Sequence, residues 1–265
     1  MEPLTERSGR VVAAAKLHRT AARRKAERFL VEGTNSIESA IPAGLVVELF
    51  VTTDAAEKYQ SLVSAASACG APVTIVTERA AAALSDTVTP VGMVAVCRTV
   101  DVDLADILDR KPSLVAMPVE AGEPGNAGTI IRVADAAGAD GVVFAGDSVD
   151  PHNGKVVRSA AGSLFHLPVC RERSITDAIA AARASGLQIL ATAASGEVGL
   201  ADAGPLLERP TVWLFGNEAH GLSDEVTALA DARVSIPIYG RAESLNLAVS
   251  AGICLYASAL AQHRK

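Results

Sequence analysis

The chain alternates between segments with helical spacing of apolar residues and short, continuously apolar segments. In the first hundred residues this pattern predicts helices over 10–28, 35–41, 54–70 and 78–84. It predicts strands between them, over 29–31, 45–51, 72–76 and 92–96. Asp54 is expected to cap the third of these helices. Helices and strands that alternate in this way are typical of an α/β fold.

The pattern restarts after residues 98–103, so this segment is interpreted as a linker between a domain of residues 1–98 and a second of residues 104–265. In the second domain we expect strands over 114–117, 141–144, 188–193, 212–215 and 234–236, and helices over 129–137, 176–184 and 245–261. Short apolar strands between helices are typical of a mostly parallel sheet that is covered on both faces.

The composition is that of a soluble globular protein and excludes a mainly disordered chain, with 49% hydrophobic, 20% charged and only 3% aromatic residues. No apolar run reaches the ~20 residues that cross a bilayer. The charged N-terminus lacks the apolar stretch of a signal peptide. Because no two cysteines form a CxxC pair, a reduced, cytoplasmic protein is expected. The cysteines are Cys69, Cys97, Cys170 and Cys254.

Basic residues are concentrated at the N-terminus. The first 30 residues hold eight basic and three acidic side chains, a net charge of +5, whereas the whole chain has a net charge of −6. This asymmetry indicates a basic, nucleic-acid-binding face on an acidic protein. A solvated helix face is the alternative interpretation.

Several motifs of common enzyme classes fail here. The glycines between 122 and 128 have the spacing GxxGxxG, whereas the dinucleotide fingerprint is GxGxxG. Gly154 and Lys155 do not complete a P-loop. The segment 146–150 departs from the hydrolase elbow GxSxG at its last position. The histidines form no i, i+4 pair, so no metal is expected.

Three segments stand out as chemically unusual. In the first, Asn126–Gly138, Arg132 lies among apolar residues of a predicted helix. An arginine is costly to bury unless an anion meets it. The alternatives are that Arg132 lies on an exposed stripe or pairs with Asp135.

The second segment, 213–223, is an apolar strand that ends at Gly216-Asn217-Glu218. Gly216 would let the backbone approach a ligand closely, and Glu218 is a candidate anchor for a cationic or hydroxylic group. Ser223 is expected to cap the next helix. A loop with one exposed acid is the alternative.

The third segment, 236–256, carries an irregular loop into the last helix, and Ser244 is expected to cap that helix. Asn246 falls in the first turn, where it would face the strand ends. Ala248, Ala251 and Gly252 give the helix a small-residue face that allows close packing against another helix.

Taken in this order, the three segments resemble the SpoU/TrmH family of RNA ribose 2′-O-methyltransferases, in the SPOUT superfamily. The first motif matches at Asn126, Arg132 and Gly138, the second at Gly216, Asn217, Glu218 and Gly221, and the third at Ile236, Pro237, Ser244, Leu245, Asn246 and Ala248. The N-terminal segment is similar to the family's substrate-binding domain, a ribosomal-protein-like α/β RNA-binding fold. The resemblance is closest to members that modify large-subunit ribosomal RNA, including the thiostrepton-resistance type.

The resemblance implies a C-terminal SPOUT domain with a parallel sheet and a deep trefoil knot. It implies a homodimer through this domain, with the last helix near the interface. It also implies S-adenosylmethionine as the cofactor, bound largely by backbone groups of three loops, and no metal. The implied cofactor-binding residues are Thr192, Ala193, Phe215, Gly216, Asn217, Ile236, Ser244 and Leu245.

The implied catalytic residues are Arg132, Asn126, Glu218 and Asn246. Because a guanidinium stays protonated at neutral pH, Arg132 is a poor general base. We expect it to bind the target phosphate or stabilise the developing alkoxide, while a nearby phosphate oxygen takes the proton. The other three residues would orient Arg132 and the ribose.

The RNA-binding residues expected from the resemblance are Arg23, Arg24, Lys25, Arg28 and Arg158, although Arg158 could equally be an ordinary surface charge.

The sequence therefore predicts an enzyme that transfers a methyl group from S-adenosylmethionine to a ribose 2′-hydroxyl of structured RNA, foremost 23S ribosomal RNA. Transfer RNA is the alternative substrate. A non-catalytic RNA-binding protein of the same fold is the alternative function. A nucleotide-dependent enzyme of the Rossmann type is a further alternative, but it would need the GxGxxG turn that the sequence lacks.

Overall fold

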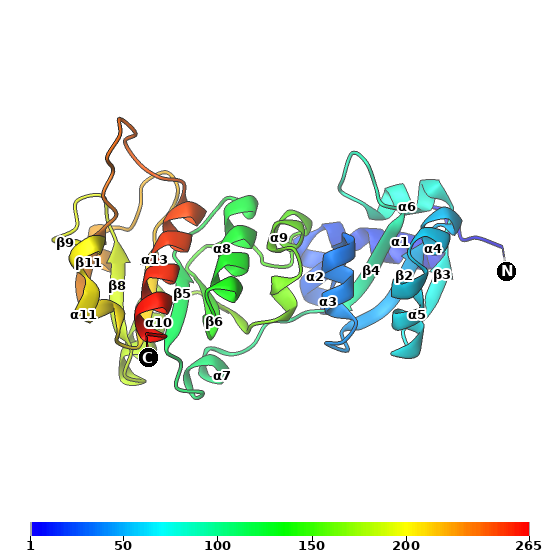
Figure 1. Cartoon of the computed structure of the whole chain (residues 1–265). Coiled ribbons are helices and arrows are strands. Elements are labelled where there is room, and N and C mark those ends of the chain that lie inside the picture. The colour runs from blue at the N-terminus through cyan, green and yellow to red at the C-terminus, as the bar shows by residue number, and fades with distance from the viewer. Residues whose placement is uncertain (1, 265) are drawn as a thin grey trace. The chain divides into compact units, whose positions relative to one another are not determined.

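A computed structural model describes residues 2–264 and divides them into two compact units (Figure 1). The first unit comprises the chain up to Val100 together with Asp150–His166. The second comprises Asp101–Val149 and the chain from Leu167 onward. The segment 150–166 belongs to the first unit because Phe29 packs its ring against His152 and Phe165, at centroid distances of 4.6 and 6.2 Å. Such a return of the chain depends on contacts distant in sequence, and the pattern along the chain does not contain them.

The first unit has a four-stranded mixed sheet in the order β1-β4-β2-β3, in which β4 is antiparallel to both neighbours and β2 is parallel to β3. The strands are β1 (Arg28–Glu32), β2 (Val46–Val51), β3 (Val73–Ile75) and β4 (Met93–Arg98). The helices are α1 (Gly9–Ala15), η1 (Lys16–His18), α2 (Thr20–Ala26), α3 (Thr34–Ala40), α4 (Thr53–Lys58), α5 (Gln60–Ala68), α6 (Glu78–Leu84), α9 (Gly154–Ala160) and η2 (Ser163–Phe165).

Two helices that the sequence predicts as continuous are interrupted. Arg19 is extended between η1 and α2, and the guanidinium of Arg23 donates hydrogen bonds to the carbonyls of Leu17 and His18 at 3.0 and 2.9 Å. The helix expected over 54–70 is divided into α4 and α5. Its cap is Thr52, whose hydroxyl accepts from a backbone N–H, so the expectation that Asp54 caps it was wrong.

The second unit has a seven-stranded sheet, in the order β7-β6-β5-β10-β8-β11-β9, whose strand pairs are all parallel, as the sequence predicts. The strands are β5 (Leu114–Pro118), β6 (Gly141–Ala145), β7 (Val169–Glu172), β8 (Gln188–Thr192), β9 (Val198–Gly199), β10 (Thr211–Phe215) and β11 (Ala232–Ser235). The helices are α7 (Leu104–Leu108), α8 (Pro124–Ala136), α10 (Ile175–Ala184), η3 (Leu200–Asp202), α11 (Gly204–Leu207), α12 (Asp224–Thr227) and α13 (Leu247–Gln262).

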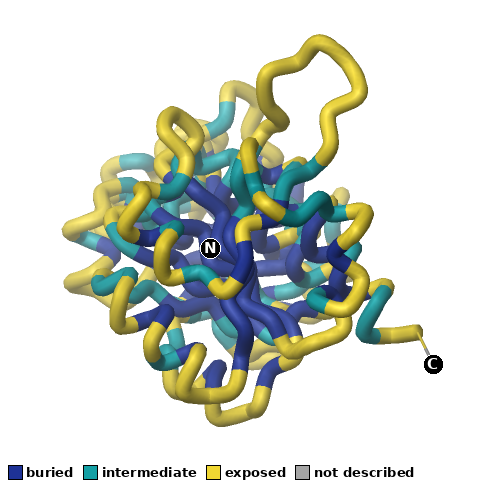
Figure 2. Tube along the Cα trace, turned by 90° about the vertical axis from the view of Figure 1, so that its left-hand side faces the viewer, coloured by how far each residue is buried: buried dark blue, intermediate teal, exposed yellow. Residues whose placement is uncertain are grey.

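Helices cover both faces of this sheet. The central strands β5, β6 and β10 are buried along their whole length, which suits a sheet between two helical layers. Figure 2 shows that the buried parts of the chain lie inside and the exposed parts around them. Residues of α7 and α10 join the apolar cluster on one face. On the other face α8 and α13 lie side by side (Figure 1). There Trp213 of β10 is fully buried and its indole N–H donates to the hydroxyl of Ser258 in α13 at 2.9 Å.

Both helices of that layer begin at residues other than those predicted. Helix α8 begins at Pro124, because the carboxylate of Glu123 accepts the N–H of Asn126 at 2.7 Å and caps it. Helix α13 is capped by Asn246, whose side-chain oxygen accepts the N–H groups of Ala248 and Val249 at 2.9 and 3.3 Å. The cap predicted at Ser244 was therefore wrong.

Ser223 caps α12 as predicted, because its hydroxyl accepts the N–H of Val226 at 3.3 Å. The sequence did not predict helices α7, α9 and α11, nor strands β7 and β9. All are short, and short elements give a weak periodic signal. Over residues 2–264 no helix combines the length and the apolar character needed to span a membrane.

Candidate active site

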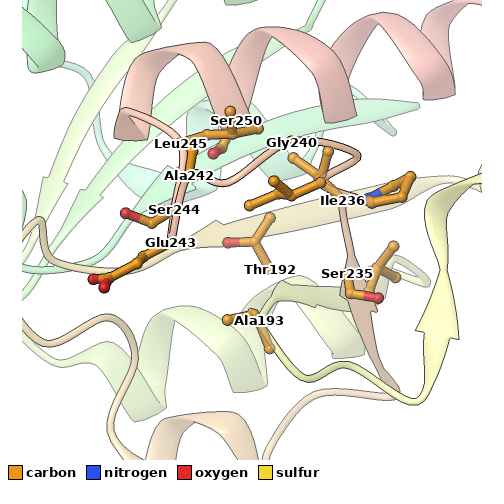
Figure 3. A pocket seen from close by; sticks show the side chains of 14 residues that line it. Thr192, Ala193, Ser235, Ile236, Gly240, Ala242, Glu243, Ser244, Leu245 and Ser250 are labelled. Atoms are coloured by element: carbon orange, nitrogen blue, oxygen red, sulfur yellow. The ribbon is translucent and has the colours of Figure 1, made fainter.

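Two adjoining cavities open at the carboxyl ends of β8, β10 and β11, which is the edge where parallel α/β sheets bind ligands. The smaller encloses about 440 Å³ and the larger about 820 Å³. Pockets that bury small ligands typically enclose ~300–1,000 Å³. Figure 3 shows the smaller cavity between the end of β8 and the loop that leads into α13. Five of the expected cofactor-binding residues line it: Thr192, Ala193, Ile236, Ser244 and Leu245.

The wall of the smaller cavity is small, apolar and hydroxylic, and Glu243 is its one charged residue. Within residues 2–264 no hydrogen bond engages the backbone from 237 to 245. The N–H and C=O groups of this loop are therefore available to a ligand with hydrogen-bonding edges. A single acidic residue and no basic one favours a ligand that carries positive charge.

The three motifs converge through side-chain hydrogen bonds beside the larger cavity. The carboxylate of Glu218 accepts from the N–H groups of Gly122 and Glu123 at 3.2 and 3.1 Å, and from the side-chain amide of Asn126 at 3.0 Å. The side-chain amide of Asn246 in turn donates to the side-chain oxygen of Asn126 at 2.9 Å. This chain of contacts fixes the ends of β5, β10 and the start of α13 relative to one another.

The hydrogen bonds also control the charge of Glu218. Partial burial by itself would raise the pKa of this carboxyl, but the donors of Asn126, Gly122 and Glu123 outweigh it and lower the pKa below its usual value. Glu218 is therefore an anion at neutral pH, and it is committed to holding the loop before α8.

Residues 216–221 form a tight loop after β10. Asn217 and Gly221 exchange two backbone hydrogen bonds, and the side-chain amide of Asn217 donates to the carbonyl of Glu120 at 2.7 Å. A side chain at Gly216 would put its Cβ 2.3 Å from the carbonyl carbon of Gly221. Glycine is therefore required at this position because the chain folds back on itself, and Gly216 also lines the larger cavity.

Two expected site residues lie outside both cavities. Phe215 is fully buried and its carbonyl accepts the N–H of Val119 at 2.8 Å. Arg132 is exposed on α8 and makes no hydrogen bond or ion pair with any residue from 2 to 264. Six residues at 3.6 per turn place it about 120° from Asn126 around the helix axis. Arg132 therefore does not face the cavity beside Asn126 of its own chain.

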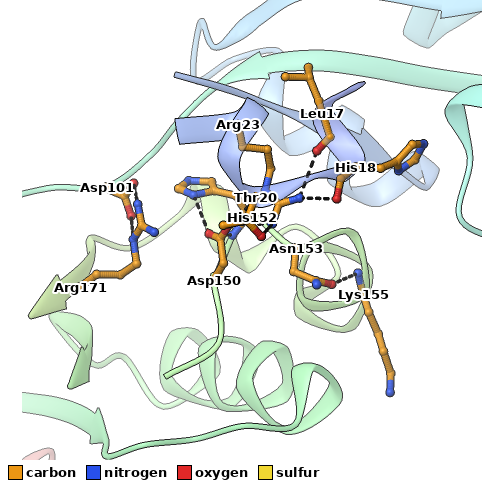
Figure 4. A network of polar contacts seen from close by, with 10 residues as sticks. All are labelled: Leu17, His18, Thr20, Arg23, Asp101, Asp150, His152, Asn153, Lys155 and Arg171. Atoms are coloured by element: carbon orange, nitrogen blue, oxygen red, sulfur yellow. Dashed lines mark hydrogen bonds and ion pairs between the residues drawn. The ribbon is translucent and has the colours of Figure 1, made fainter. Parts of the chain in front are cut away.

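The expected RNA-binding residues separate into two groups. Arg24, Lys25 and Arg28 are exposed, whereas Arg23 is only 4% exposed. The guanidinium of Arg23 donates to the carboxylate of Asp150 at 2.9 and 2.7 Å, as well as to two carbonyls and a hydroxyl (Figure 4). All its donors are used inside the first unit, so the expectation that Arg23 contacts RNA is corrected: its role is structural.

Arg158 is partly buried, and its guanidinium lies 3.5 Å from the carboxylate of Glu32, which also accepts from the hydroxyl of Thr87 at 2.8 Å. The buried carboxylate of Glu32 thus uses Arg158 as a partner. This contact leaves the side chain less available to RNA than the exposed cations of α2.

The larger cavity contains titratable residues that the sequence analysis did not select. They are Glu123, His220, Asp224 and Arg233. His220 lies within the second motif and Asp224 three residues after it, and their place after a strand end was the one sequence signal that could have found them. In the part of the chain from 2 to 264, no group of three or more His, Cys, Asp or Glu side chains is placed to hold a metal ion.

The fold and the site define an α/β protein with a small-molecule site at the strand ends of a parallel sheet, next to a loop anchored by Glu218. The model of the SpoU rRNA Methylase family matches residues 113–256, and that of the MRM3-like substrate binding domain matches residues 9–95. The chain belongs to the SpoU rRNA Methylase family.

Similar proteins match more than nine-tenths of the chain. The 23S rRNA (guanosine(2553)-2′-O)-methyltransferase RlmP of Bacillus subtilis is 36% identical over 91% of this chain and 92% of its own length. The SpoU methyltransferase AviRb of Streptomyces viridochromogenes, solved in complex with AdoMet, superposes with a TM-score of 0.83 and 32% identity over 96% of this chain and 98% of its own. An AdoMet-bound rRNA methyltransferase of Sinorhizobium meliloti superposes with a TM-score of 0.83 and 30% identity over 97% of both chains.

Proposed function

We propose that the chain transfers a methyl group from S-adenosylmethionine to a ribose 2′-hydroxyl of 23S ribosomal RNA. The observation that carries the proposal is the network in which Glu218, Asn126 and Asn246 join the three family motifs at one edge of the sheet. RlmP of Bacillus subtilis, which matches 91% of this chain, is a 23S ribosomal RNA 2′-O-methyltransferase.

The smaller cavity fits S-adenosylmethionine. Its volume is in the range of small-ligand pockets, its loop backbone can pair with an adenine edge, and its charge suits a sulfonium cation. Thr192, Ala193, Ile236, Ser244 and Leu245 would hold the molecule. When bound, it supplies an electrophilic methyl group.

The residues beside the larger cavity position the ribose. Glu218 holds the loop before α8, so that the side chains of Asn126 and Asn246 stay in place as hydrogen-bonding groups at the strand ends. Groups held before the reaction lower the cost of orienting the substrate. Arg132 binds the phosphate next to the target ribose or stabilises the developing alkoxide.

A homodimer explains how Arg132 reaches a cavity that it does not face in its own chain. Helix α13 carries an exposed apolar stripe of Val249, Ile253, Tyr256 and Leu260, with the i, i+4, i+7 spacing of one helix face. A second copy would cover this stripe, and α8 with Arg132 lies next to α13. We therefore propose that Arg132 acts in the partner's site.

Three further properties are part of the proposal. Residues 1–98 would form the RNA-binding domain and residues 104–265 the catalytic domain, and the latter would contain the deep trefoil knot. A cytoplasmic location suits an enzyme of ribosomal RNA.

Transfer RNA is the second candidate substrate, because a tRNA (guanosine(18)-2′-O)-methyltransferase of Escherichia coli is 36% identical. That match covers only 56% of this chain. Ribosomal RNA is favoured because the first unit also has a counterpart in ribosomal RNA enzymes.

The test is incubation with tritiated S-adenosylmethionine and unmodified 23S ribosomal RNA, followed by alkaline hydrolysis of the product. A 2′-O-methyl group blocks cleavage at one linkage, so one protected position establishes both reaction and substrate. Incorporation into transfer RNA alone would contradict the ribosomal substrate. If the chain binds the methyl donor and labels neither RNA, a non-catalytic RNA-binding role would replace the proposal.

A further inference from the structure

The proposed reaction must remove a proton from the ribose hydroxyl, and most titratable residues around the larger cavity are unsuited to accept it. Glu218 and Glu123 are committed, the first to the loop before α8 and the second to the cap of that helix. Arg233 is a cation that pairs with Glu197 at 2.6 Å. Asp224, like Glu243 of the smaller cavity, is a carboxylate, and carboxylates are weak bases at neutral pH. The remaining titratable residue is His220.

His220 stands on a rigid loop. It precedes Gly221, whose two backbone hydrogen bonds with Asn217 close the loop, and it follows Glu218, whose carboxylate ties the loop to the start of α8. The side chain of His220 is 61% exposed. Its imidazole is therefore presented from a fixed backbone and remains accessible to a substrate as large as RNA.

Glu120 provides the imidazole with a carboxylate neighbour. Its Oε2 lies 3.8 Å from Nε2 of His220. The backbone at Glu120 has a φ of +52°, in the left-handed region that residues other than glycine rarely adopt. The chain holds it there, since its N–H donates to Ala145 and its carbonyl accepts from Asn217. A glycine would adopt this conformation without strain, so a glutamate here indicates use of its side chain.

We infer that His220 is a further catalytic residue, the base that accepts the proton of the ribose 2′-hydroxyl, with Glu120 as its positioning residue. The O–H bond breaks as the oxygen forms its bond to the methyl carbon, and the electron pair of the S–CH₃ bond goes to sulfur. The proton forms an N–H bond at Nδ1, the imidazole nitrogen on the side away from Glu120. Glu120 stabilises the resulting imidazolium, which afterwards releases the proton to water.

This inference rests on the proposed function, and it assigns the proton to the protein in place of a phosphate oxygen of the RNA. Glu120 lies against His220, and the charged residues that line the cavity with it are Glu123, Glu218, Asp224 and one cation, Arg233, which pairs with Glu197.

The test compares wild type with His220→Gln and Glu120→Gln in single-turnover methyl transfer to 23S ribosomal RNA at a series of pH values. Donor binding is measured by calorimetry. Wild-type activity should fall at acid pH, where the imidazole is already protonated. In His220→Gln the rate should fall about 100-fold or more, and its pH profile should lose this acid limb. The affinity for S-adenosylmethionine should stay unchanged. Glu120→Gln should lower the rate by a smaller factor than His220→Gln, because the imidazole loses its positioning partner. His263→Gln, an exposed histidine outside both cavities, should behave as wild type.

A chemical rescue makes the test independent of folding. In His220→Ala, added imidazole should restore part of the rate, whereas it should not help Glu218→Gln. A His220→Gln rate near wild type, or a reduced rate that keeps the wild-type acid limb, would overturn the inference and favour a phosphate oxygen as base. If wild-type protein labels no RNA, the proposed function itself fails and the inference falls with it.

Discussion

The side-chain amide of Asn246 donates to the side-chain oxygen of Asn126 at 2.9 Å, although 120 residues separate the two asparagines. Each lies in the first turn or cap of its helix, so the contact joins the N-terminal ends of α13 and α8. Asn126 also donates to Glu218. A substitution at any of the three residues should therefore displace the side chains of the other two.

Glu218→Gln should lower methyl transfer about 100-fold, because an amide nitrogen would face the N–H groups that now donate to the carboxylate, and the ribose site would shift.

Since the pKa of Glu218 is lowered, the hydrogen-bond network around its carboxylate should stay intact as the pH falls from neutral to about 5. Its stabilising contribution is present above the usual pKa of a glutamate and is lost as the pH falls through the lowered one. Calorimetry of donor binding against pH checks this, with the exposed Glu208→Gln as control.

Arg132→Ala should bind S-adenosylmethionine as wild type does, because the side chain of Arg132 lies outside both cavities of its own chain. It should lose most methyl transfer, because the proposed contact of Arg132 with the substrate in the partner's site is removed. Co-expression of Arg132→Ala with Glu218→Gln should restore about a quarter of wild-type activity. Random pairing makes half of the dimers mixed, and each mixed dimer has one complete site. Mixed preparations without activity would show that Arg132 acts within its own chain.

Ile253→Asp together with Leu260→Asp should produce monomers, since both side chains belong to the apolar stripe of α13 and a buried, unpaired carboxylate is costly. Analytical ultracentrifugation measures the change. Val12→Asp, an exposed apolar residue of α1, should leave the assembly of the protein unchanged. A double variant that sediments like wild type would exclude this face as the interface.

Reversing the charges of Arg24, Lys25 and Arg28 should weaken RNA binding and flatten its salt dependence. Each lost phosphate contact lowers the slope of log affinity against log salt by about 0.7–0.9. Filter binding at several salt concentrations measures the slope, and Arg110→Glu, an exposed cation of the second unit, is the control. An unchanged slope in the triple variant would move the RNA site to another surface.

Asp150→Asn should destabilise the first unit by about 3–5 kcal/mol, because it removes the partner of a buried guanidinium. Burial by itself would raise the pKa of Asp150, but hydrogen bonds from His152 and Arg23 lower it far below its usual value. The contribution of the Asp150 carboxylate to the free energy of unfolding is therefore present above the usual pKa of an aspartate, and it is lost as the pH falls toward the lowered pKa. Urea unfolding measures it, and the exposed Asp54→Asn should change stability by less than about 0.5 kcal/mol.

The sequence predicted the parallel sheet, and it selected residues that the fold brings together. Strand ends of a parallel sheet meet at one edge, so Asn126, Glu218 and Asn246 could be grouped from their places after apolar segments. The buried role of Arg23 could not be predicted, because its acceptors come from Asp150 and from carbonyls freed by a break in the helix. A count of basic residues does not distinguish a buried cation from an exposed one.

The choice between neighbouring residues was also beyond the sequence. Ser244 and Asn246 are both good helix caps, and only the path of the loop decides between them. Arg132 and Asn126 share one motif, yet the helical turn directs them to different sides of α8. The spacing of a motif indicates that two residues serve one site, but it does not show whether both come from the same chain.

The hydrogen bond between Trp213 and Ser258 gives this protein an intrinsic optical reporter. Trp213 is the single tryptophan of the chain, it is fully buried on β10, and its indole nitrogen is bound by α13. Its fluorescence therefore comes from one known place, two residues before Phe215 and the loop of the second motif. Any event that lifts α13 from the sheet exposes this indole to water and shifts its emission to longer wavelength, without a label.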